Sequence, residues 1–208
     1  MTDAAKPLGA ILLAGGRASR VDGAAKPLFE VGGRTLLHAA VTAVTDAAAR
    51  PITAVAPVLD ETLPIAWVRE DPPFSGPAAA IVAALGSWQE ADDPEWTLLL
   101  ACDLPGVGAA VQRLVDDLPL LPADTDGICL ADRSSRPQWL IGAYRTRALR
   151  VAASALPDAG RDAPVRALLD DLAIVVVTAS DDLTRDVDTW EDLEEARRRA
   201  GRAPEESP

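Results

Sequence analysis

Short apolar segments alternate with helix-like segments along almost the whole chain, and this alternation constrains the fold most. The expected strands are residues 9–14, 52–56, 65–68, 96–101, 127–131, 139–144 and 173–178. The expected helices are residues 35–50, 78–88, 107–118, 146–155, 164–172 and 190–200. Apolar strands without a polar face are typical of sheets that are covered on both sides. The pattern therefore predicts an α/β fold, a Rossmann-like three-layer α/β/α sandwich with a mostly parallel sheet.

The length of 208 residues suits one domain. We expect a single domain over residues 1–200 and a disordered tail over residues 201–208, because short polar ends are poorly ordered. Aromatic residues make up only 4% of a chain that is 49% hydrophobic. The core must therefore consist mainly of Ala, Val, Leu and Ile.

The chain is acidic, with a formal net charge of −12. Such a charge disfavours sequence-independent binding to nucleic acid, which depends on neutralising phosphates. Every apolar run is too short to span a bilayer, so we expect no membrane contact. Cys102 and Cys129 have no metal-binding spacing, and no secretory signal precedes them. Reduced thiols in a cytoplasmic protein are the simplest interpretation.

The segment from Leu13 to Pro27 directly follows the first expected strand and contains Gly15 and Gly16. Glycines let the backbone approach a ligand and present N–H groups to it. Arg17, Arg20 and Lys26 add positive charge suited to phosphate, and the two arginines can bind it bidentately. The segment matches neither the Walker A motif nor Gly-x-Gly-x-x-Gly. It predicts a phosphate-binding loop; the alternative is a solvated surface loop.

Asp103 ends a strongly apolar strand and is followed by Leu104 and Pro105. In a parallel sheet, the carboxyl end of a strand lies on the ligand side. A carboxylate there can hold Mg²⁺ against substrate phosphates. The alternative is that Asp103 caps the next helix.

Another acidic segment, residues 186–193, precedes the last expected helix. Its acidic residues suit the first turn of a helix, with Asp188 or Thr189 as the N-cap of a capping box. This segment alone does not separate capping from metal binding.

Three stretches together resemble the MobA-like NTP transferases, and in particular the molybdenum cofactor guanylyltransferases. They are Leu-Ala-Gly-Gly-x-x-x-Arg at 13–20, Lys-Pro at 26–27 and Gly-Gly-Arg-Thr-Leu-Leu at 32–37. The resemblance implies the nucleotide-diphospho-sugar transferase fold and a magnesium-dependent nucleotidyltransferase. The nucleotide contacts that it implies are Leu13, Ala14, Gly15, Gly16 and Lys26. Arg20 and Lys26 would hold the triphosphate, and Asp103 would complete the catalytic set.

The Asp-Leu-Pro at 103–105 is similar to the family's Asp-x-Pro, and Asp188 stands at the second metal-binding position. The resemblance therefore implies Asp103 and Asp188 as Mg²⁺ ligands. Residues 70–78 resemble the family's Asp-to-Gly-Pro loop, which implies that Asp71 and Gly76 lie near the nucleotide. The segment around Arg136 resembles the part that faces the acceptor, and Arg166 is a further candidate anion contact.

The resemblance implies that GTP donates GMP to the phosphate of molybdopterin and that pyrophosphate leaves. It also implies contacts with molybdoenzymes or with other proteins of cofactor biosynthesis. The chain has no asparagine, so the Asn that some members carry on the second strand is missing. Three alternatives stay open: a molybdenum cofactor cytidylyltransferase, another sugar- or alcohol-phosphate nucleotidyltransferase, and a non-catalytic nucleotide-binding cofactor chaperone.

Overall fold

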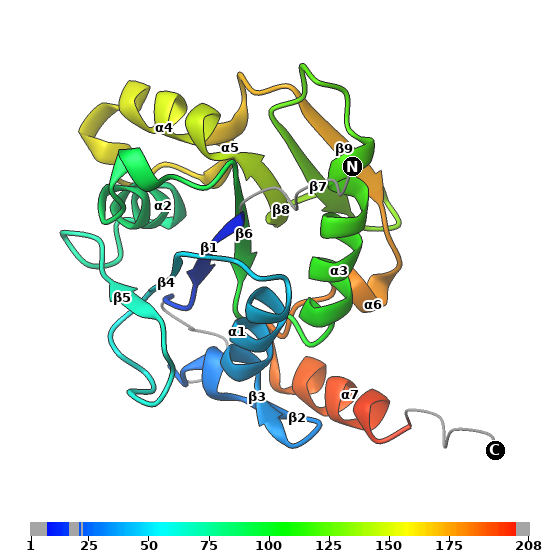
Figure 1. Ribbon diagram of the computed structural model, residues 1–208. Coiled ribbons are helices and arrows are strands. Elements are labelled where there is room, and N and C mark those ends of the chain that lie inside the picture. The colour runs from blue at the N-terminus through cyan, green and yellow to red at the C-terminus, as the bar shows by residue number, and fades with distance from the viewer. Residues whose placement is uncertain (1–7, 17–20, 22, 203–208) are drawn as a thin grey trace.

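A computed structural model describes residues 8–16, 21 and 23–202. Figure 1 shows a central sheet with helices on both faces. Its seven strands lie in the order β5-β4-β1-β6-β8-β7-β9, and every strand except β8 runs in the same direction. The strands are β1 (Leu8–Leu13), β4 (Ile52–Val55), β5 (Ala66–Val68), β6 (Trp96–Ala101), β7 (Gly127–Ala131), β8 (Pro137–Arg145) and β9 (Ile174–Thr178). The predicted α/β fold with a mostly parallel sheet is confirmed.

The helices form the two outer layers. They are α1 (Leu36–Asp46), α2 (Pro77–Gly86), α3 (Val107–Asp117), α4 (Thr146–Ala155), α5 (Val165–Leu169), α6 (Asp181–Thr184) and α7 (Trp190–Ala200). Alternate residues of the central strands serve opposite layers: Leu12 packs with α1 and α3, whereas Ile11 packs with α2, α4 and α5. The cores on the two faces of the sheet are therefore built on the apolar strands that the sequence predicts.

The order in which strands are added to the sheet switches from one side of β1 to the other between β5 and β6. From β1 it moves outward through β4 to β5, and then crosses back to β6 on the other side of β1. Leu13 pairs in register with Ala101, so the loops that leave these two strands start side by side and diverge. Such a switch in strand order forms a crevice at the carboxyl edge of an open sheet, where ligands bind.

Some local features differ from the expectation. A hairpin of β2 (Glu30–Val31) and β3 (Arg34–Thr35) precedes α1, because Gly32 and Gly33 adopt positive φ angles of 61° and 78°. Helix α1 ends at Asp46, before the expected end near Arg50, because Ala48 adopts a φ of 56° and starts a turn. None of the helices in the described part of the chain has the length and apolar character to span a membrane.

Candidate active site

The loop after β1 begins at the switch point with Ala14, Gly15 and Gly16. A Cβ atom on Gly15 would lie 3.2 Å from the carbonyl oxygen of Val55, so the loop passes very close to β4. Lys26 opens the short 3-10 helix Lys26–Leu28, and its side chain turns back toward the end of β6. The predicted phosphate contacts Arg17 and Arg20 lie outside the described residues.

Asp103 follows β6 and places a partly buried carboxylate in the crevice. Its Oδ1 atom is buried without a hydrogen-bond partner among the described residues, and its Oδ2 lies 3.9 Å from Lys26 Nζ. Burial, and next the charge of Asp186, raise the pKa of Asp103 to about 6, although Lys26 opposes the shift. Helix α3 takes Gly106 as its N-cap and has no side-chain cap, so the alternative role of Asp103 as a helix cap is wrong.

The segment that precedes α7 brings two more carboxylates to Asp103. Val187 is buried between α1 and α7, and its N–H donates to the carbonyl oxygen of Asp103 at 2.9 Å. Asp186 and Asp188 flank this anchor, and one oxygen from each lies within 4.8 Å of the other and of an Asp103 oxygen. Lys26 Nζ donates to Asp188 Oδ1 at 2.5 Å. The structure thus brings together Lys26, Asp103 and Asp188 as predicted residues, and adds Asp186.

Sequence reasoning missed Asp186, although the signal was present. Residues two apart in an extended segment point to the same side, so Asp186 accompanies Asp188. Burial, followed by the charge of Asp188, raises the pKa of Asp186. The predicted capping box exists as well, and of the two predicted N-caps it is Thr189 that forms it, with Asp192. Capping therefore does not use the Asp188 carboxylate, which contacts Lys26 instead.

These residues fit a divalent cation such as Mg²⁺. Three carboxylates supply the hard oxygen ligands that this ion prefers, and Asp103 Oδ1 lacks, in the described part of the chain, the hydrogen-bond partner that a buried oxygen requires. Without a cation, the Lys26 ammonium neutralises only part of the charge of the cluster. The negative charge that remains therefore favours a divalent cation at this site.

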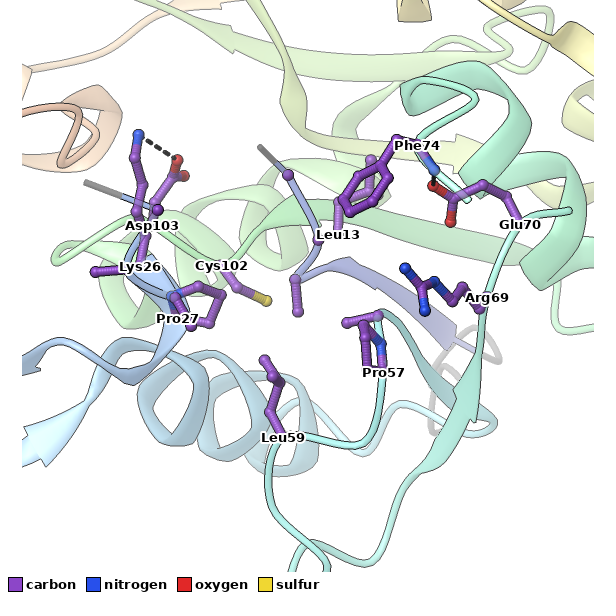
Figure 2. Close-up of a pocket in the computed structure, with 17 residues that line it drawn as sticks. Leu13, Lys26, Pro27, Pro57, Leu59, Arg69, Glu70, Phe74, Cys102 and Asp103 are labelled. Carbon is purple, nitrogen blue, oxygen red and sulfur yellow. Dashed lines mark hydrogen bonds and ion pairs between the residues drawn. The ribbon is translucent and has the colours of Figure 1, made fainter. Parts of the chain in front are cut away.

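A cavity of about 320 Å³ opens beside the cluster, between the loop after β1 and the segment after β4 (Figure 2). The predicted nucleotide contacts Leu13, Ala14, Gly15, Gly16 and Lys26 all line it, as does Asp103. Three residues that sequence reasoning did not select complete its far wall: Arg69, Glu70 and Phe74. The cavity thus joins a polar wall near β5 to the cationic end at Lys26.

The structure distinguishes the two adjacent carboxylates of the loop after β5. Glu70 lines the cavity, whereas Asp71 is exposed and does not line it. Gly76 lines an adjoining cavity of about 350 Å³, together with Leu13, Gly15 and Glu70. The nucleotide-binding role of Asp71 stays a prediction, with no support from its position.

A third cavity, of about 830 Å³, lies on the other side of Asp103. Both predicted acceptor contacts, Arg136 and Arg166, line it, and so does Asp186. Its apolar wall is formed by Trp139, Leu140, Ile141, Ile174 and Val176. Arg166 pairs with Asp170 at 2.9 Å, one helical turn away. Asp103 lines all three cavities and therefore stands where they meet.

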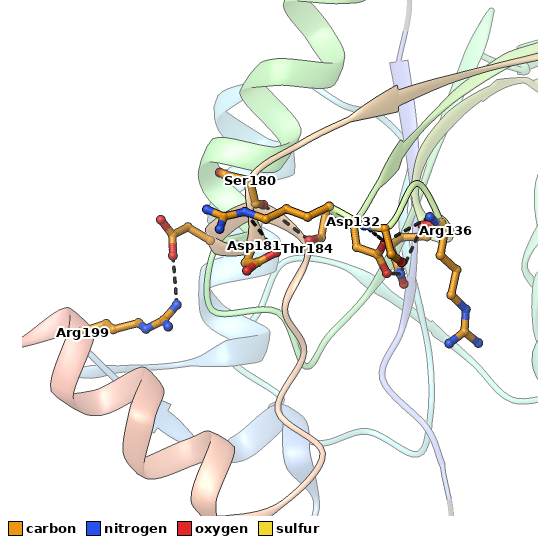
Figure 3. Close-up of polar contacts among 10 residues, drawn as sticks. Asp132, Arg136, Ser180, Asp181, Thr184 and Arg199 are labelled. Carbon is orange, nitrogen blue, oxygen red and sulfur yellow. Dashed lines mark hydrogen bonds and ion pairs between the residues drawn. The ribbon is translucent and has the colours of Figure 1, made fainter.

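The turn that carries Arg136 is held by Asp132 (Figure 3). Asp132 Oδ1 accepts the N–H groups of Ser134 and Arg136 at 2.9 and 3.0 Å, and Oδ2 accepts from Gln138 Nε2 at 3.2 Å. The hydrogen bond from the Ser134 hydroxyl is the main reason that the pKa of Asp132 is lowered. Sequence reasoning missed this residue, because an Asp in a polar turn has no distinctive pattern.

A glycine loop and a carboxylate cluster at the switch point of a parallel sheet define the class of nucleotide-binding α/β proteins. The model of the MobA-like NTP transferase domain matches residues 10–193. The chain therefore belongs to the MobA-like NTP transferase family and is a nucleotidyltransferase of that family.

Two named relatives and one solved structure illustrate the similarity. A "probable molybdenum cofactor guanylyltransferase" of Synechococcus elongatus is 32% identical over 162 residues, which are 74% of this chain and 79% of that protein. A molybdenum cofactor guanylyltransferase of Pseudomonas putida is 29% identical over 88% of this chain and 93% of its own length. A nucleotidyl transferase of Methanothermobacter has the same fold, with a TM-score of 0.69, 22% identity, and coverage of 94% of this chain and 98% of that one.

Proposed function

We propose that the chain transfers GMP from GTP to the phosphate of a molybdopterin-type acceptor and releases pyrophosphate. One observation carries the proposal: Asp103 lies where a nucleotide-sized cavity meets a second, arginine-lined cavity. Two anionic substrates that enter from opposite sides would bring their phosphates together beside this carboxylate. Both named relatives are called molybdenum cofactor guanylyltransferases, which agrees with the proposed substrates.

The donor would lie in the 320 Å³ cavity, with its triphosphate toward Lys26 and the loop after β1. The backbone N–H groups of Gly15 and Gly16 and the Lys26 ammonium suit phosphate oxygens. Asp103, Asp186 and Asp188 would hold Mg²⁺, which when bound neutralises phosphate charge and polarises the α-phosphate. Arg20 stays a predicted triphosphate contact, by resemblance to the family.

Glu70 is the best candidate to select guanine. Guanine presents two adjacent donors, N1–H and N2–H₂, on its Watson–Crick edge, and a carboxylate accepts both. The Glu70 carboxylate lines the cavity and accepts the N–H of Phe74 at 2.8 Å, which fixes its position. A carboxylate on this wall therefore provides guanine selectivity that does not depend on the missing asparagine.

The acceptor would lie in the 830 Å³ cavity. Trp139 and the aliphatic wall suit a flat heterocycle, and Arg136 suits an anionic group at the rim. The acceptor phosphate would face the donor's α-phosphorus beside Asp103. A phosphate oxygen is already anionic, so its attack needs no strong general base. The residues of the chain then act by positioning the two phosphates and by balancing their charge.

The proposal is tested by following pyrophosphate while the chain is incubated with Mg²⁺, molybdopterin and each nucleoside triphosphate in turn. We expect release with GTP that depends on the acceptor. Release with CTP alone would move the donor assignment to a cytidylyltransferase. No release with any nucleotide, either with molybdopterin or with sugar and alcohol phosphates, would contradict the enzyme proposal and favour a non-catalytic chaperone.

A further inference from the structure

Phe74 is a bulky apolar residue beside the candidate site, and its backbone conformation is unusual. Its φ angle is 66°, in the left-handed region that bulky residues rarely adopt. The residue is also 49% exposed, and it belongs to none of the hydrophobic core clusters that the described residues form. Backbone strain of this kind persists where the surrounding structure enforces it, and it is concentrated at ligand-binding sites.

The loop around Phe74 is firmly held on both sides. The Phe74 N–H donates to Glu70 Oε1 at 2.8 Å, and the Ser75 hydroxyl donates to the carbonyl oxygen of Pro72 at 2.5 Å. Ser75 is buried, and its carbonyl oxygen accepts the N–H of Asp162 at 2.7 Å. The position of the ring therefore follows from a network that also fixes the Glu70 carboxylate.

The ring itself lines the donor cavity and the adjoining cavity against α2. The Arg69 guanidinium lies 5.4 Å from the ring centroid, within the range of a cation–π contact. Figure 2 shows Phe74, Glu70 and Arg69 together at the end of the cavity that is remote from Lys26. A nucleotide whose phosphates lie at Lys26 would place its base at this end.

We propose that Phe74 is a nucleobase-stacking residue of the donor site, and this proposal depends on the function proposed above. The exposed part of the ring would be covered by the flat face of the base, while Glu70 would read the edge of that base. Stacking on an aromatic ring tolerates any base, because every base has a π-face. Phe74 would therefore set affinity for the donor, and Glu70 would set the choice among donors.

Phe74→Gly tests the proposal, because glycine adopts a φ of 66° without strain and the variant removes the side chain while the loop keeps its backbone conformation. Binding of GTP and of inorganic tripolyphosphate is measured by calorimetry with Mg²⁺, alongside thermal unfolding. We expect GTP affinity to fall about tenfold, within the range of base–aromatic stacking. Tripolyphosphate affinity and the unfolding temperature should stay close to those of the wild type. The matched variant Phe74→Tyr keeps an aromatic ring, so its GTP affinity should stay close to that of the wild type.

Each other outcome counts against a specific part of the account. Unchanged GTP affinity in Phe74→Gly, with normal wild-type binding, would overturn stacking and leave the proposed function intact. An equal loss for GTP and for tripolyphosphate would show that Phe74 only shapes the loop. A wild-type chain that binds tripolyphosphate as tightly as every nucleoside triphosphate would overturn both proposals.

Discussion

At the scale of single residues, the crevice is built at a cost to stability. The Asp103 side chain is 25% exposed, and it lies beside Asp186 and Asp188, whose repulsion the Lys26 ammonium partly offsets. Burial and repulsion raise its pKa from 3.8 to about 6. The Asp103 carboxyl group therefore holds a proton more tightly in the folded state than in the unfolded state. The contribution of the protonated Asp103 carboxyl group to the free energy of unfolding is therefore fully present below about pH 4, and it is lost as the pH rises through 6.

Asp103→Asn should accordingly stabilise the protein in the absence of divalent cations. We expect a gain of about 2 kcal/mol at pH 7, because each unit of pKa shift corresponds to about 1.4 kcal/mol and Lys26 is left with fewer partners. The gain should shrink toward zero at pH 4. Chemical denaturation at both pH values measures it, and Mg²⁺ should then stabilise the wild type more than the variant. A variant less stable than the wild type at pH 7 would contradict the inferred strain.

Glu70 and Asp71 form a natural pair for testing base selection, because they are adjacent and only Glu70 lines the donor cavity. Glu70→Gln keeps an oxygen that can accept the Phe74 N–H but loses the charge. We expect KM for GTP to rise about tenfold, the typical effect of losing a charged hydrogen-bond partner. Asp71→Asn should change KM by less than twofold. Steady-state kinetics with the two variants would refute the assignment if Asp71→Asn had the larger effect.

At the scale of elements, the contact between α3 and α6 positions the acidic segment that follows α6. A Cβ atom on Gly106 would lie 1.9 Å from the carbonyl oxygen of Asp182, so only glycine permits this approach. Asp186 and Asp188 follow within six residues of that contact. Gly108 lies two residues further along, within α3, and a Cβ atom there would have no described neighbour within 4 Å.

Gly106→Ala should therefore displace α6, destabilise the protein by about 1–3 kcal/mol and weaken Mn²⁺ binding. Gly108→Ala is the matched control, and it should raise stability by about 0.5–1 kcal/mol because alanine favours a helix. Denaturation and calorimetric titration of Mn²⁺ measure both effects. Unaltered Mn²⁺ affinity in a destabilised Gly106→Ala variant would show that the contact does not position the carboxylates.

At the same scale, the limits of prediction have physical causes. The strand that leads to Asp103 was predictable, because its apolar run ends in a single carboxylate. The direction of β8 was not, because an apolar strand has the same pattern in either direction. Likewise, the backbone of the loop decides which of Glu70 and Asp71 faces the cavity. The spacing of Asp186 and Asp188 indicates a shared side, but the approach of both to Asp103 depends on the tertiary fold. Contacts formed across the fold leave no local signal.

At the scale of the whole molecule, the topology explains why the site lies at Asp103. The loops after β1 and β6 diverge at the switch in strand order, and the donor cavity opens there, whereas the arginine-lined cavity lies on the β8 side of Asp103. Lys26, Arg69, Arg136 and Arg166 line these cavities in a chain with a net charge of −12. Local positive charge of this kind suits small anionic substrates in a protein that disfavours nucleic acid.

The central claim is that two phosphates meet beside Asp103, and label transfer tests it most directly. GTP labelled at the α-phosphorus is incubated with the wild-type chain, Mg²⁺ and molybdopterin, and the products are separated. The account predicts that the label appears in the acceptor, with one pyrophosphate released for each transfer, and that Asp103→Asn transfers none. A label that stays in GTP or appears in free GMP, or an Asp103→Asn variant with normal transfer, would contradict it.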